Sequence, residues 1–169
     1  KPTVSKDFDS TTNPKDSRVS TKTSGLKSIF NFDYFNDIQS ACYPIIWKTN
    51  NNMIISAPTG SGKTVLFELA ICKLFSLEDF TEITSSLKVI YIAPIKTLCQ
   101  QKFSEWQEKF TKFNLKLLEL TGDTEINDFA QFDSANIIIT TPEKWDATTR
   151  RWKDNNRLVL NVKLLLIDE

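Results

Sequence analysis

The sequence predicts an α/β fold in which a parallel sheet is flanked by helices. Short apolar runs recur along the chain, and three of them are continuous stretches of Ile, Leu and Val rather than alternations of apolar and polar residues. Continuous runs are expected of strands that are buried on both faces. Segments of helical length separate the runs, and strands that alternate with helices form parallel sheets. In such sheets a ligand binds beyond the carboxyl ends of the strands.

The expected elements follow one another in a regular order. Strands are expected at residues 53–55, 89–93, 115–120, 137–139 and 164–167. Helices are expected at residues 34–48, 63–76, 96–113 and 142–152. The second of these helices is apolar almost all round and should be deeply buried, whereas the third carries a single apolar stripe that should pack on the core. Pro142 suits the first position of its helix, after Thr141 as the N-cap.

The beginning of the chain differs in composition from the rest. Ten of the first 24 residues are Ser or Thr, and large apolar residues are few. Such a segment cannot bury enough apolar surface to offset the entropy of ordering, which predicts a flexible tail over residues 1–28. Residues 29–169 are expected to form one domain that is cut off at the acidic pair at its end.

Composition excludes several classes of function. The 21 Lys and Arg balance the 21 Asp and Glu, so any nucleic-acid site must be a local groove and not a basic globule. The chain has no His, which excludes histidine bases and zinc sites that need imidazole. Its three Cys form no CxxC pair and are expected to be small buried hydrophobes. No apolar run approaches the roughly 20 residues of a membrane span, so a soluble, intracellular protein is expected.

The strongest motif is the segment APTGSGKT at residues 57–64, between an expected strand and an expected helix. Gly60 and Gly62 allow positive φ and a close backbone approach, so that successive N–H groups can cradle a phosphate at the helix N-terminus. Lys63 should reach the β- and γ-phosphates, and the Thr64 hydroxyl should bind Mg²⁺. The expected ATP-binding residues of the loop are Thr59, Gly60, Ser61, Gly62, Lys63 and Thr64.

A second motif supplies carboxylates for the same chemistry. Asp168 and Glu169 follow the apolar run 164–167, so a buried strand should present them at its carboxyl end. Asp168 is expected to bind Mg²⁺ through water, and Glu169 to orient or deprotonate the attacking water. The expected catalytic set is Lys63, Thr64, Asp168 and Glu169.

Five segments together resemble one family. In chain order they are APTGSGKT, APIKTL (93–98), LTGDT (120–124), TTPEKWD (140–146) and LLLIDE (164–169). They resemble the first RecA-like domain of superfamily 2 helicases, specifically the Ski-two-like group of DExH-box enzymes, over residues 29–169. Segments 34–40, 93–110 and 140–155 look most like the branch of DNA helicases that promotes meiotic crossovers. Spliceosomal and signal-cointegrator helicases share TPEKWD, so RNA remains an alternative substrate.

The resemblance implies roles for further residues. Gln39 matches the glutamine that reads adenine in this family. An aromatic ring just upstream should stack on the base; Phe32 is the first candidate, and Phe30 and Phe35 are alternatives. Three turns that follow expected strands match the segments that contact the nucleic-acid backbone in this family. The first contains Pro94, Lys96 and Thr97, the second Thr121 and Gly122, and the third Thr141, Pro142, Glu143 and Lys144.

The resemblance also implies the partners of the whole protein. They are ATP with Mg²⁺, single-stranded or branched DNA, and a second RecA-like domain of the same protein whose arginines complete the ATP site. A 3′-to-5′ direction and a nuclear location are implied as well, and the 169 residues alone should turn over ATP negligibly. Two other interpretations remain: a different P-loop NTPase, although a guanine-reading Asn-Lys-x-Asp is absent from the sequence, and a non-enzymatic docking module.

Overall fold

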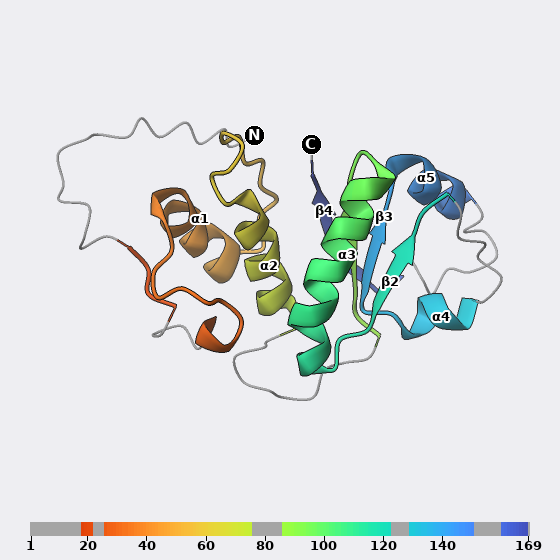
Figure 1. Ribbon diagram of the computed structural model, residues 1–169, viewed down its shortest axis with the longest axis horizontal. Coiled ribbons are helices and arrows are strands. Elements are labelled where there is room, and N and C mark those ends of the chain that lie inside the picture. Colours follow the sequence, from red (N-terminus) through yellow and green to blue (C-terminus); the bar gives the residue numbers. More distant parts are fainter. Residues whose placement is uncertain (1–17, 22–25, 76–85, 123–128, 151–159, 169) are drawn as a thin grey trace. The chain divides into compact units, whose positions relative to one another are not determined.

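The computed structural model describes residues 18–21, 26–75, 86–122, 129–150 and 160–168. The chain divides into two compact units, Lys1–Leu66 and Phe67–Glu169. The boundary falls within helix α2 (Lys63–Leu74), so the first turn of this helix belongs to the first unit (Figure 1).

The first unit has an aromatic cluster beside helix α1 (Asp37–Lys48). The ring of Phe35 lies 5.6 Å from those of Phe30 and Phe32, and 5.8 Å from that of Tyr43 on α1. The 3-10 helix η1 (Leu26–Ser28) adds Leu26, which is fully buried. Such interlocked rings contribute beyond the area that they bury.

Parts of the predicted flexible tail pack within this unit. Ser20 forms an antiparallel bridge with Tyr34, and the Thr21 hydroxyl donates to the carbonyl oxygen of Phe32 at 2.6 Å. Together with η1, these contacts place residues 18–21 and 26–28 beside the aromatic cluster. The rest of the predicted tail, residues 1–17 and 22–25, lies outside the described residues.

The strand expected at residues 53–55 does not form. These residues have no strand geometry, and Ile54 is fully exposed. Backbone hydrogen bonds of a strand come from a neighbouring strand, and no described residue pairs with this segment. The expectation was wrong because three apolar residues in a row do not by themselves provide that partner.

The second unit contains a parallel sheet, which confirms the α/β fold class. Its strands are β1 (Lys88–Ile92), β2 (Leu117–Leu120), β3 (Ile137–Thr140) and β4 (Val162–Ile167), in the spatial order β2-β3-β1-β4. Every pairing is parallel. All residues of β1 and β3 are buried, as their continuous apolar sequences predict.

Helices cover both faces of this sheet. On one face Ile90 and Ile138 pack with Phe132 of α4 (Phe129–Ser134), and Trp145 of α5 (Pro142–Arg150) packs against this cluster. On the other face Tyr91 lies 5.0 Å from Trp106 of α3 (Lys96–Phe110). The alternation follows from the period of two in a strand, which sends neighbouring side chains to opposite faces. A 3-10 helix, η2 (Thr111–Phe113), continues α3.

A buried lysine holds α4 at the amino end of the sheet. Lys88 is only 1% exposed, and its Nζ donates to the carbonyl oxygens of Phe132, Asp133 and Ala135 at 2.8, 2.8 and 2.9 Å. Carbonyls at the end of a helix lack partners within the helix, and a cation there also suits the helix dipole. Burial lowers the pKa of Lys88, and the charge of Asp133 opposes that shift.

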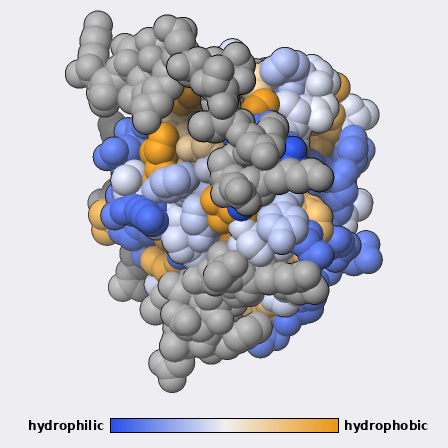
Figure 2. Space-filling view, turned by 90° about the vertical axis from the view of Figure 1, so that its left-hand side faces the viewer, coloured by the Kyte–Doolittle hydropathy of each residue, from blue (hydrophilic) through white to orange (hydrophobic). Residues whose placement is uncertain are grey.

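Hydrophobic residues on the described surface are scattered. On the face in Figure 2 they form separate patches (orange) among hydrophilic residues (blue). Among the described residues, every helix is too short or too polar to cross a membrane.

Candidate functional site

The predicted phosphate loop adopts the backbone that its glycines suggest. Gly60 and Gly62 have φ of +80° and +82°, and helix α2 begins immediately afterwards at Lys63. The positive φ favours glycine at residue 62, and a Cβ there would also overlap the side-chain amide of Gln39, which would have to move.

Helix α1 holds this loop through its first turn. Asn36 and Gln39 form a capping box, in which each side chain accepts from the backbone N–H of the other. Asn36 Nδ2 also donates to the carbonyl oxygen of Ser61 at 2.9 Å, and Gln39 Nε2 donates to that of Gly62 at 3.2 Å. The predicted adenine-reading Gln39 is thus 5% exposed and in contact with the phosphate loop.

Two side chains of the loop are arranged as a phosphate site requires. Lys63 Nζ donates to the carbonyl oxygens of Ala57 and Pro58 at 2.7 and 3.3 Å, which folds the lysine back over the loop. The Ser61 hydroxyl is buried without a hydrogen-bond partner in the described residues. A buried hydroxyl normally has a partner, so Ser61 fits a site that binds an oxygen-rich ligand. Thr64 follows in the first turn of α2, and Thr59 is exposed at the tip of the loop.

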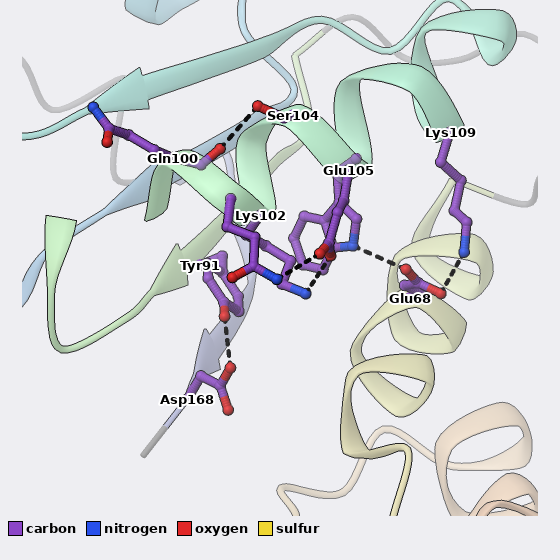
Figure 3. A network of polar contacts seen from close by, with 10 residues as sticks. Glu68, Tyr91, Gln100, Lys102, Ser104, Glu105, Lys109 and Asp168 are labelled. Carbon is purple, nitrogen blue, oxygen red and sulfur yellow. Dashed lines mark hydrogen bonds and ion pairs between the residues drawn. The ribbon is translucent and has the colours of Figure 1, made fainter. Parts of the chain in front are cut away.

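Asp168 is fixed at the carboxyl end of β4 by two hydrogen bonds with strand β1. Its backbone N–H donates to the carbonyl oxygen of Ile92 at 2.9 Å, and its Oδ2 accepts from the hydroxyl of Tyr91 at 2.6 Å (Figure 3). Burial, with the hydrogen bond to Asp168, raises the pKa of Tyr91 far above its ordinary value, so the phenol remains a donor. Glu169, the other carboxylate of the predicted catalytic pair, lies outside the described residues.

The predicted magnesium ligands, Asp168 and Thr64, both carry oxygen donors. No three described His, Cys, Asp or Glu residues gather at one point. Mg²⁺ is usually bound by one or two carboxylates, substrate phosphates and water. The half-buried Asp168 carboxylate and the Thr64 hydroxyl are oxygen donors of that kind.

The predicted nucleic-acid residues gather around a cavity in the second unit. The cavity has a volume of about 470 Å³, and six predicted residues line it: Pro94, Lys96, Gly122, Thr141, Glu143 and Lys144. The other three, Thr97, Thr121 and Pro142, are sequence neighbours of lining residues, and Thr121 is buried. Ile95 and Ala147 complete the wall.

The topology explains why residues so distant in sequence meet. The three turns follow β1, β2 and β3, which run parallel and are adjacent in the sheet, so their carboxyl ends share one edge. Two lysines and one glutamate border the cavity, which gives a local excess of positive charge in a chain without net charge.

Sequence reasoning missed two residues of these sites, Asn36 and Tyr91. Asn36 could have been found, because Asn followed three residues later by Gln is a capping pattern. Tyr91 had a weaker signal: it is the one polar-tipped residue in the apolar run 89–93, and a buried tyrosine hydroxyl usually has a partner.

The comparisons with known proteins agree with this geometry. The DEAD/DEAH box helicase family matches residues 36–169. The chain is 51% identical over 145 residues to "Probable ATP-dependent DNA helicase HFM1" of Mus musculus, covering 85% of this chain and 10% of that protein. It is 49% identical over 144 residues to "ATP-dependent DNA helicase MER3" of Saccharomyces cerevisiae, covering 85% and 12%. The chain thus spans roughly a tenth of the length of these relatives.

A solved structure shares the fold. The crystal structure of the DUF1998 helicase MrfA bound to DNA and AMPPNP matches with a TM-score of 0.69 and 22% identity, over 91% of this chain and 21% of that one.

Proposed function

Because the chain belongs to the DEAD/DEAH box helicase family, we propose that it is the ATP-binding part of a 3′-to-5′ DNA helicase that acts in the nucleus during meiotic recombination. The mouse relative is named as a probable ATP-dependent DNA helicase and the yeast relative as an ATP-dependent DNA helicase, and the matched segment covers only 10% and 12% of their lengths. The remaining length leaves room for the second RecA-like domain and its arginines, which the ATP site needs for turnover.

The observation that carries the proposal is the cavity at the carboxyl ends of β1, β2 and β3. A P-loop alone is common to many NTPases, whereas a second site that gathers three turns after strands and two lysines favours a protein that binds a phosphate backbone. Contacts of this kind position a strand without reading its sequence. A cavity of about 470 Å³ is a local binding site for a nucleic-acid strand, which suits a translocating enzyme whose chain has no net charge.

The nucleotide is proposed to bind at the phosphate loop. Lys63 would exchange its contacts with the carbonyls of Ala57 and Pro58 for phosphate oxygens, and the Ser61 hydroxyl would gain a partner. Gln39 would read adenine with its remaining donor and acceptor capacity. Mg²⁺, when bound with the nucleotide, neutralises charge that develops on the phosphates. Thr64 and Asp168 would hold it, and Glu169 would orient the attacking water.

The proposal is tested in the full-length protein by ATPase assays with single-stranded DNA and with RNA of the same sequence. Lys63→Ala should abolish strand-stimulated turnover, and DNA should stimulate more than RNA. Intact stimulation in Lys63→Ala would overturn the nucleotide site. Stronger stimulation by RNA would favour an RNA helicase of the same group, and a preference for GTP over ATP would favour a different NTPase.

A further inference from the structure

We propose that Tyr91 is a positioning residue for the magnesium-binding carboxylate of Asp168, an inference that rests on the function proposed above. The Tyr91 hydroxyl donates to Asp168 Oδ2 at 2.6 Å, which is short for a hydrogen bond between oxygens and is typical of a charged acceptor. Oδ1 carries no hydrogen bond within the described residues, so the phenol occupies one carboxylate oxygen and leaves the other for the metal's water.

The ring that carries this hydroxyl is buried and packs against two other aromatic rings. Tyr91 is 1% exposed and lies in β1, where it pairs in the ladder with Leu166 of β4. Its ring meets Phe67 of α2 at 5.9 Å and Trp106 of α3 at 5.0 Å, both edge to face. A buried ring in such packing has a single orientation, so the hydroxyl holds one place.

The packing around Tyr91 is itself anchored by a buried polar network (Figure 3). Trp106 Nε1 donates to Glu68 Oε1 at 3.0 Å, and Lys109 Nζ donates to Glu68 Oε2 at 2.7 Å. Glu68 lies in α2 and is 5% exposed. The network therefore ties α2 to α3, and α3 in turn fixes the ring that orients Asp168.

Asp168 needs such support because its backbone leaves it free to rotate. It is the first residue after β4, half-buried, and one backbone hydrogen bond to Ile92 sets its position but not its χ1. Hydrogen bonds from outside the ligand set orient metal-binding side chains, and losing one typically lowers metal affinity or activity by about 10- to 100-fold.

The test is Tyr91→Phe in the full-length protein, which removes one oxygen and keeps the ring packing. The Mg²⁺ concentration that half-saturates strand-stimulated ATPase should rise by about 10-fold, and kcat at saturating Mg²⁺ should change less. In calorimetry without turnover, metal-free ADP affinity should stay at the wild-type value, whereas the gain in affinity on adding Mg²⁺ should shrink. Tyr34→Phe, the same deletion at a 60% exposed tyrosine, is the matched control and should change neither.

The outcomes separate this inference from the function on which it rests. If Tyr91→Phe lowers the melting temperature but leaves the Mg²⁺ dependence unchanged, Tyr91 is structural only and the inference is overturned. Asp168→Asn should abolish the Mg²⁺ effect on ADP binding, and Tyr91→Phe should add nothing in that background. If Asp168→Asn retains the wild-type Mg²⁺ effect, the metal role of Asp168 fails and the role of Tyr91 fails with it.

Discussion

Gln39 Nε2 donates to the carbonyl oxygen of Gly62 at 3.2 Å, and a Cβ added at Gly62 would overlap that same nitrogen. The helix that carries the predicted base-reading residue therefore also supports the phosphate loop. A substitution of Gln39 or Gly62 should therefore affect both base recognition and the phosphate loop, and the two effects can be separated only by comparing paired variants.

Gly62→Ala should weaken ATP binding more than Gly60→Ala does. Both substitutions strain a positive φ, at a cost of roughly 1 kcal/mol. A Cβ at residue 62 would also displace Gln39, whereas one at residue 60 meets open space. Equilibrium binding of a fluorescent ATP analogue to the full-length variants measures the difference. Equal reductions in affinity would show that the contact with Gln39 does not matter for the nucleotide.

Gln39→Ala and Asn36→Ala should differ in nucleotide selectivity. Both side chains hold the loop, through Gly62 and Ser61 respectively, so both variants should bind ATP more weakly. If Gln39 also reads adenine, its removal should narrow the preference for ATP over GTP, and the removal of Asn36 should leave that ratio unchanged. Competition of ATP against GTP measures it, and an unchanged ratio in Gln39→Ala would limit this residue to supporting the loop.

Lys96→Ala and Lys144→Ala should each weaken binding to single-stranded DNA of any sequence. Each lysine borders the cavity beyond the sheet edge, and removing one lysine–phosphate interaction should reduce the slope of log affinity against log salt by about 0.7. Lys116→Ala is the control, because this exposed lysine precedes β2 at the opposite end of the strand. If Lys116→Ala lowers the salt-dependence slope as much as Lys96→Ala and Lys144→Ala do, the nucleic acid does not bind specifically at this cavity.

Glu68→Ala should destabilise the domain by about 3 kcal/mol, because it leaves the indole N–H of Trp106 unpaired and Lys109 without its buried partner. Glu68→Gln keeps an acceptor for Trp106 and should cost about half as much stability. Glu108→Ala, on the exposed side of α3, should lie within about 0.5 kcal/mol of the wild type. Thermal unfolding of the full-length variants ranks them, and equal melting temperatures would contradict the role of Glu68.

Much of the second unit could be predicted from the sequence, because its signals are local. The continuous apolar runs predicted β1 and β3. The apolar stripe expected over residues 96–113 consists of Cys99, Phe103, Trp106, Phe110 and Phe113, and all of these are buried except Phe103, which is partly buried. Helix α4 was missed, because six residues with two polar side chains and one charge carry no clear period.

The contacts that link elements could not be predicted. Residues 53–55 could form a strand only beside a neighbouring strand, and local sequence propensity does not show whether such a neighbour exists. The same holds for Tyr91 and Asp168, which are 77 residues apart and meet only through the register of β1 with β4. Sequence motifs predicted the candidate site residues, whereas the contacts that hold those residues in place depend on hydrogen bonds between distant parts of the chain.

Strand β1 serves both ends of the proposed chemistry. Tyr91 donates to the carboxylate of Asp168, which is proposed to bind Mg²⁺, and Pro94, three residues or roughly 10 Å of extended chain further on, already borders the cavity. The intervening Ile92 and Ala93 are buried and bonded to β4 and β3, so this short stretch of backbone is stiff. A small displacement at the proposed nucleotide site should therefore be transmitted along β1 to the proposed nucleic-acid site, because no flexible loop separates the two.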